Sequence, residues 1–106
     1  MLNIQDEAYL LTQTIAKKYQ PDKIILFGSV ARGNIRKDSD IDLLIIKKSD
    51  QKKAYRIKKI FETVRTITRN YPLDPLVYTP EEIQHRLSLG DYFIRRIFAE
   101  GKTLYG

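Results

Sequence analysis

The sequence predicts a small α/β (α+β) fold in which a mixed sheet of three or four strands is backed by helices. Short runs rich in β-branched apolar residues alternate along the chain with longer segments that carry apolar residues at helical spacing. Glycine or proline stands near most boundaries between these segments. The composition, 42% hydrophobic and 30% charged over 106 residues, is typical of a globular protein, and this length suits one hydrophobic core. We therefore expect a single domain over residues 1–106.

The first half of the chain holds four segments with a clear apolar period. They are a helix over residues 4–19, a buried strand over 23–27, a second strand over 40–46 and a helix over 51–69. Gly28 and Ser29 end the first strand abruptly, and residues 30–34 are expected to form one helical turn before a polar loop.

A third strand is predicted over residues 73–78. Because proline offers no N–H to a sheet ladder, Pro75 places this strand at a sheet edge or delays its start to Leu76.

Two helices and a small strand are predicted to close the chain. Thr79 and Pro80 are typical of an N-cap and a first helical position, and the helix that they begin is expected to end near residue 87. Residues 91–100 predict the last helix, and residues 103–105 a small strand after it. The side chains expected to point inward from the last helix are Phe93, Ile94, Ile97 and Phe98.

Composition excludes several classes of function. The chain has no cysteine, which rules out disulfides, cysteine-based zinc sites and thiol catalysis. The first residues lack the basic start and apolar run of a signal peptide, and no stretch approaches the ~20 apolar residues of a membrane span. We therefore expect a cytoplasmic location and no membrane association. The net charge of +6 suits either an anionic partner or a surface that is merely basic.

Phosphate binding is the function that the turn at Gly28 and Ser29 indicates. Glycine has no Cβ to block an approaching phosphate, the N–H groups of the next helical turn point at it, and Ser29 can add a hydroxyl donor. A tight turn without any ligand would use the same two residue types.

Acidic residues at the start of two predicted strands indicate a metal site. Asp40 and Asp42 are two apart on one strand, so their side chains share a face with Cα atoms ~6.6 Å apart. Such carboxylates can converge on one divalent ion, or on two ions ~3.5–4 Å apart, and oxygen ligands favour Mg²⁺ or Mn²⁺. Asp74 reaches the same face if the strands are adjacent. Solvated aspartates in turns are the alternative at all three positions.

Together these residues form a pattern that resembles a known superfamily. The apolar-Gly-Ser step at residues 27–29 and the Asp-apolar-Asp-apolar step at residues 40–43, with ten residues between them, are similar to the signature of the DNA polymerase beta-like nucleotidyltransferases. Four segments more closely resemble the minimal nucleotidyltransferases, which are often encoded beside a helical HEPN-domain protein. These segments are GSVARG (28–33), DSDIDLLI (38–45), LDPLVYTPEEI (73–83) and GKTLYG (101–106).

The resemblance implies which residues bind the nucleotide. Gly28 and Ser29 would hold the triphosphate, and Arg32 would neutralise phosphate charge. The alternative for Arg32 is a salt bridge to Asp38 or Asp40.

The resemblance also implies a catalytic role for the three acids. Asp40 and Asp42 would ligate two Mg²⁺ ions. Asp74 would be the third acidic ligand and would position or deprotonate the attacking hydroxyl. Pro75 departs from the apolar residue that usually follows this acid.

The implied reaction moves a nucleotidyl group from a nucleoside triphosphate to an acceptor, and pyrophosphate leaves. The expected group is AMP, from ATP, and another nucleoside triphosphate is the alternative donor. The implied acceptor is a HEPN-domain toxin, for which this chain would be the antitoxin. One alternative is a catalytically silent antitoxin that acts by contact. Another is transfer to a small molecule, as in aminoglycoside nucleotidyltransferases.

Two segments have competing interpretations as interaction surfaces. Residues 47–59 contain seven basic residues and one acid, which is typical of a solvated helix face. Nucleic acid is a minor expectation there, because no aromatic stacking motif accompanies the charge. The aromatic residues Tyr92, Phe93 and Phe98 either pack in the core or dock the partner, and a homo-oligomer could also complete the acceptor site.

Overall fold

The computed structural model describes residues 2–106; Met1, the first residue of the predicted domain, lies outside this range. The described residues form five helices and four strands, which confirms the predicted α/β class. In chain order they are α1 (Ile4–Tyr19), β1 (Lys23–Phe27), α2 (Gly28–Ala31), β2 (Ile41–Ile46), α3 (Lys53–Thr63), β3 (Leu73–Tyr78), α4 (Pro80–Ser88), α5 (Tyr92–Glu100) and β4 (Lys102–Tyr105).

The four strands form one mixed sheet in the order β3-β2-β1-β4. β1 is antiparallel to both β2 and β4, whereas β2 and β3 run parallel. The edge position predicted from Pro75 is confirmed, because β3 borders the sheet and includes this proline. The small strand predicted over residues 103–105 is also present, as the border strand β4.

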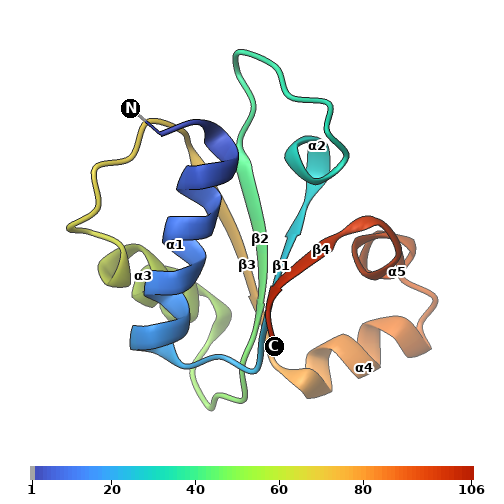
Figure 1. Ribbon diagram of the computed structural model, residues 1–106. Helices are drawn as coiled ribbons and strands as arrows, with labels where there is room; N and C mark the ends of the chain where they lie inside the picture. Colours follow the sequence, from blue (N-terminus) through green and yellow to red (C-terminus); the bar gives the residue numbers. More distant parts are fainter. Residues whose placement is uncertain (1) are drawn as a thin grey trace.

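Helices cover both faces of the sheet and give the molecule three layers (Figure 1). α1 and α3 lie on one face, and α4 and α5 lie on the other. Successive strand residues alternate between the two cores: Leu43 and Ile45 of β2 belong to the first, and Leu44 and Ile46 to the second. Within residues 2–106, no helix combines the length and apolar character needed to cross a bilayer.

Some helix bounds differ from the expected ones. α3 ends at Thr63 rather than at residue 69. The residues that follow, Thr66, Ile67 and Thr68, are all β-branched and lose side-chain freedom in a helix. The turn after β1 also begins earlier than expected, because α2 starts at Gly28 itself.

The prediction that Phe93 and Phe98 point inward is wrong. These side chains are 50% and 42% exposed, and α5 contacts the sheet through Ile94 and Ile97. At 3.6 residues per turn, positions 93 and 98 fall on either side of this narrow buried stripe.

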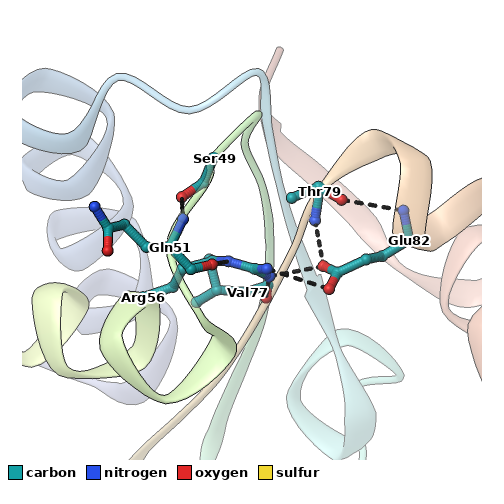
Figure 2. A network of polar contacts seen from close by, with 6 residues as sticks. All are labelled: Ser49, Gln51, Arg56, Val77, Thr79 and Glu82. Atoms are coloured by element: carbon teal, nitrogen blue, oxygen red, sulfur yellow. Dashed lines mark hydrogen bonds and ion pairs between the residues drawn. The ribbon is translucent and has the colours of Figure 1, made fainter.

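Arg56 joins the two helical layers through the end of β3, as Figure 2 shows. Its side chain is 7% exposed, and its guanidinium donates to the carbonyls of Gln51 and Val77, each at 2.9 Å, and to Glu82 at 2.7 Å. The Glu82 carboxylate also accepts the N–H of Thr79, which completes a capping box at the start of α4. One buried cation therefore fixes α3, β3 and α4 relative to one another.

The basic stretch over residues 47–59 is thus partly structural. Besides the buried Arg56, Lys47 donates from Nζ to the carbonyls of Tyr19 at 2.6 Å and Gln20 at 3.1 Å, at the end of α1. Fewer of its charges are free for an anionic partner than the sequence suggests.

We expect Arg56→Ala to lower the free energy of unfolding by about 2–4 kcal/mol, since the buried Val77 carbonyl and the Glu82 carboxylate lose their donor. Arg95→Ala, a substitution on the exposed side of α5, is the control and should change it by less than about 0.5 kcal/mol. Urea denaturation measures both. The Arg56 hydrogen bond lowers the pKa of Glu82 below its ordinary 4.5, so the Arg56→Ala deficit should shrink as the pH falls below that value. Equal stability of the two variants at pH 7 would contradict this role.

Candidate active site

Asp42 and Asp74 lie side by side because β2 and β3 are paired. They are opposite each other in the parallel ladder, and neighbouring strands are ~4.8 Å apart. Alternation along the strands places both side chains on the face that α4 and α5 cover. Each aspartate stands near the start of its strand, so the two carboxylates meet at one end of the sheet.

The pKa of Asp42 reflects this crowding. The pKa is raised from 3.8 to about 6, mainly by burial and then by the negative charges of Asp74 and Asp40, while Arg32 acts in the opposite direction. A bound cation would relieve the repulsion between the carboxylates, and their oxygen atoms are the ligands that Mg²⁺ prefers.

The Gly28–Ser29 turn approaches the same carboxylates. Phe27, the last residue of β1, is the ladder partner of Asp42, and Gly28 follows it directly. Gly28 has a φ of +77°, and a Cβ at this position would collide with Oδ2 of Asp42. Glycine is therefore required twice here, for the left-handed backbone and for the close approach of the aspartate.

Ser39 connects this turn to the loop that leads into β2. Its hydroxyl is buried, accepts the N–H of Arg36 at 2.7 Å and lies 3.5 Å from the hydroxyl of Ser29. The residue before Asp40 is thereby held next to the predicted phosphate-binding turn.

Glu7 of α1 fixes the approach to β3. Its fully buried carboxylate accepts the N–H groups of Asn70 at 2.8 Å and Tyr71 at 3.0 Å. These contacts anchor the loop directly before β3, and hence the position of Asp74.

A cavity of about 360 Å³ brings most of the predicted site residues together. Five of them line it: Gly28, Ser29, Arg32, Asp42 and Asp74. An anion that enters this cavity meets a hydroxyl and a guanidinium beside a pair of carboxylates, which is the environment that a metal-bound phosphate needs.

Asp40 stands apart from the lining of the cavity. It is exposed and precedes the first residue of β2, but its charge acts on Asp42. Among residues 2–106, no three His, Cys, Asp or Glu side chains are close enough together to form a metal site. Asp42 and Asp74 are the residues whose positions fit a divalent cation, and Asp40 remains a predicted third ligand.

Arg32 has a different ion-pair partner from those considered in the sequence. Its Nη1 lies 3.9 Å from Oε2 of Glu100, at the end of α5, rather than beside Asp38 or Asp40.

α5 forms a wall of the cavity that the sequence did not predict. Phe93, Arg96, Ile97 and Glu100 all line the cavity. Their spacing of i, i+3, i+4 and i+7 makes one helix stripe. A stripe with an aromatic, a cation, an apolar residue and an acid is unlike a core stripe, and this mixture was the signal available in the sequence. The Phe93 ring meets Phe27 edge-on at 5.9 Å between centroids, which fixes this wall against β1.

Comparison with known proteins identifies the family of this chain. Residues 11–106 match the family model described as "Polymerase beta, Nucleotidyltransferase". The chain belongs to this nucleotidyltransferase family. A provisionally assigned nucleotidyltransferase from Sulfolobus solfataricus, known from a crystal structure, superposes on it with a TM-score of 0.55. The two are 24% identical over 76% of this chain and 70% of that chain, a similarity that shows the fold alone. No match was found among curated protein sequences.

We expect Gly28→Ala to distort the candidate site, because the new Cβ displaces the Asp42 carboxylate. Gly90→Ala is a matched control: Gly90 has a φ of +76° but open space around a Cβ. Both variants should lose about 1–2 kcal/mol of unfolding free energy through backbone strain. Gly28→Ala alone should also weaken Mg²⁺–ATP binding by at least about tenfold in titration calorimetry. Equal ATP affinities in the two variants would count against the close approach at this turn.

The raised pKa of Asp42 predicts a pH dependence of stability. With a pKa of about 6 in the folded chain and 3.8 as its ordinary value, this group binds more protons in the folded state between those values. Its contribution to the free energy of unfolding therefore falls as the pH rises from 4 to 6. Asp42→Asn should lack this fall, so its stability relative to wild type should increase over this interval in urea denaturation without divalent cations. A difference that stays constant with pH would refute the carboxylate pair.

Proposed function

We propose that this nucleotidyltransferase transfers AMP from ATP to a hydroxyl group of a partner protein. The observation that carries the proposal is the cavity in which the Asp42–Asp74 pair faces the Gly28–Ser29 turn. A phosphate held at the turn lies next to the carboxylates, as attack on the α-phosphorus requires.

The reaction forms a bond between the acceptor oxygen and the α-phosphorus and breaks the bond to pyrophosphate, which leaves in line. Ser29 and Arg32 bind the phosphates that are not transferred. Asp40, Asp42 and Asp74 would hold Mg²⁺, which when bound supplies charge stabilisation for the entering and leaving oxygens. Asp74, whose side chain is exposed at the cavity, accepts the proton of the attacking hydroxyl.

The partner in this proposal is a HEPN-domain toxin, with this chain as its antitoxin. The resemblance of GSVARG (28–33) and DSDIDLLI (38–45) to the minimal nucleotidyltransferases supports this pairing. A second support is the exposure of aromatic residues on α5: Tyr92 is 72% exposed, and Phe98 and the cavity-lining Phe93 are also exposed. Aromatic side chains are enriched in the cores of protein interfaces, so α5 offers contact residues for a partner.

The same exposed aromatic residues favour a second candidate, an antitoxin that blocks its partner by contact without transferring a nucleotide. The two candidates make opposite demands on Asp42. Neutralisation of the toxin in cells by Asp42→Asn, at the level of wild type, would favour contact alone, whereas loss of protection would favour transfer.

We expect the purified chain to label a co-expressed HEPN partner when supplied with Mg²⁺ and ATP that is radiolabelled at the α-phosphate. Asp42→Ala should slow labelling by at least about a hundredfold, because the chain loses a metal ligand. Asp50→Ala, which removes an exposed aspartate outside the cavity lining, is the matched control and should label at the wild-type rate. Equal labelling by Asp42→Ala and Asp50→Ala would exclude the proposed site.

A further inference from the structure

Two arginines from different elements meet at one carboxylate in the cavity. Arg32 is the C-cap of α2, and Arg96 lies within α5. Nη1 of Arg32 lies 3.9 Å from Oε2 of Glu100, and Nε of Arg96 lies 3.4 Å from the same oxygen. All three residues line the cavity that also contains Asp42 and Asp74.

This ion-pair cluster contributes little to folding. The three side chains are 44–52% exposed, and exposed pairs are worth about 0–1 kcal/mol. Both N···O distances exceed the ~2.7–2.9 Å of a strong charge-assisted hydrogen bond. The two guanidiniums can therefore exchange Glu100 for another anion at low cost.

The helix that carries Arg96 and Glu100 is held in place at both ends. Near its start, Phe93 packs edge-on against Phe27. At its end, Gly101 has no room for a Cβ, because Cγ2 of Ile25 and the Ile97 carbonyl occupy that space. α5 is thus packed against β1, which fixes the backbone that carries Arg96 into the cavity lining.

The cavity lining carries one more carboxylate than it carries guanidiniums. Asp42, Asp74 and Glu100 contribute three carboxylates, against the two guanidiniums of Arg32 and Arg96. A triphosphate would compete with Glu100 for both arginines, and the planar guanidinium matches two phosphate oxygens at once.

We propose that Arg96 is a second triphosphate-binding residue and that Glu100 is the counter-ion of both arginines in the free protein. When a nucleoside triphosphate binds, Arg32 and Arg96 release Glu100 and bind the β- and γ-phosphates instead. This inference rests on the proposed nucleotidyl transfer. It extends the nucleotide site to α5, outside the Gly-Ser and Asp-x-Asp motifs.

Titration calorimetry with ATP and with AMP, both in the presence of Mg²⁺, tests the assignment. Arg96→Met should weaken ATP binding by about ten- to a hundredfold, the strength of a charged hydrogen bond. It should change AMP binding less than about threefold, since AMP lacks the β- and γ-phosphates. Arg95→Met, at the next position of α5 and outside the cavity lining, should change neither. Arg96→Lys keeps the charge but lacks the planar guanidinium that can bind two oxygens at once. Its ATP affinity should lie between those of wild type and Arg96→Met, and this variant also checks that the fold persists.

Glu100→Gln provides the opposite readout. Without the competing carboxylate, ATP should bind about two- to fivefold more tightly, in line with the strength of an exposed ion pair. Weaker ATP binding by Glu100→Gln would overturn the counter-ion role. Wild-type ATP affinity in Arg96→Met, or equal losses for ATP and AMP, would overturn the role of Arg96 alone. Absence of ATP binding by the wild-type chain would instead overturn the proposed function together with this inference.

Discussion

The parallel pairing of β2 with β3 is the constraint on which the site depends. It sets Asp42 directly against Asp74, an arrangement that like charges oppose. The strands remain paired because the residues that follow on the same face, Leu44, Ile46 and Tyr78, are buried under α4 and α5. Burial of this apolar face thus stabilises a contact that is unfavourable by itself, and the raised pKa of Asp42 records the cost. Groups perturbed in this way are typical of functional sites.

β3 needs support from outside the sheet, because it is an edge strand with a proline in it. Two buried side chains supply this support at opposite ends. Glu7 accepts the N–H groups of Asn70 and Tyr71 before the strand begins. Arg56 donates to the carbonyl of Val77 near the end of the strand. The position of Asp74 is therefore determined by a helix on the α1–α3 side of the sheet as well as by its strand partner, and both buried ionic groups serve the same strand.

The sequence predicts what local patterns control and misses what packing controls. Runs of β-branched residues predict the strands, and the residue types at Gly28 and Asp42 separately indicate phosphate and metal binding. The spacing between them is recognised through the family resemblance. The adjacency of Asp42 and Asp74 depends on strand order, which no local pattern determines; the family resemblance supplied it. The part of the cavity formed by α5 was missed because the helix buries only a narrow stripe around Ile94 and Ile97, and periodicity does not say which residues beside such a stripe face a cavity. The partner of Arg32 was missed because Glu100 is distant in sequence and only the packing of α5 brings it close.

The site thus lies between two walls of different origin. One wall is formed by the end of β1 and the starts of β2 and β3, which carry the Gly-Ser and aspartate residues. The other wall is α5, which follows all of these residues in the chain. Because Phe27 braces one end of α5 and the missing Cβ of Gly101 lets the other end lie against β1, this helix is a fixed wall rather than a lid. Changes in charge balance on ligand binding must then come from side chains. The long, exposed contacts of Arg32 and Arg96 with Glu100 are the part of the cavity that can rearrange without moving the backbone.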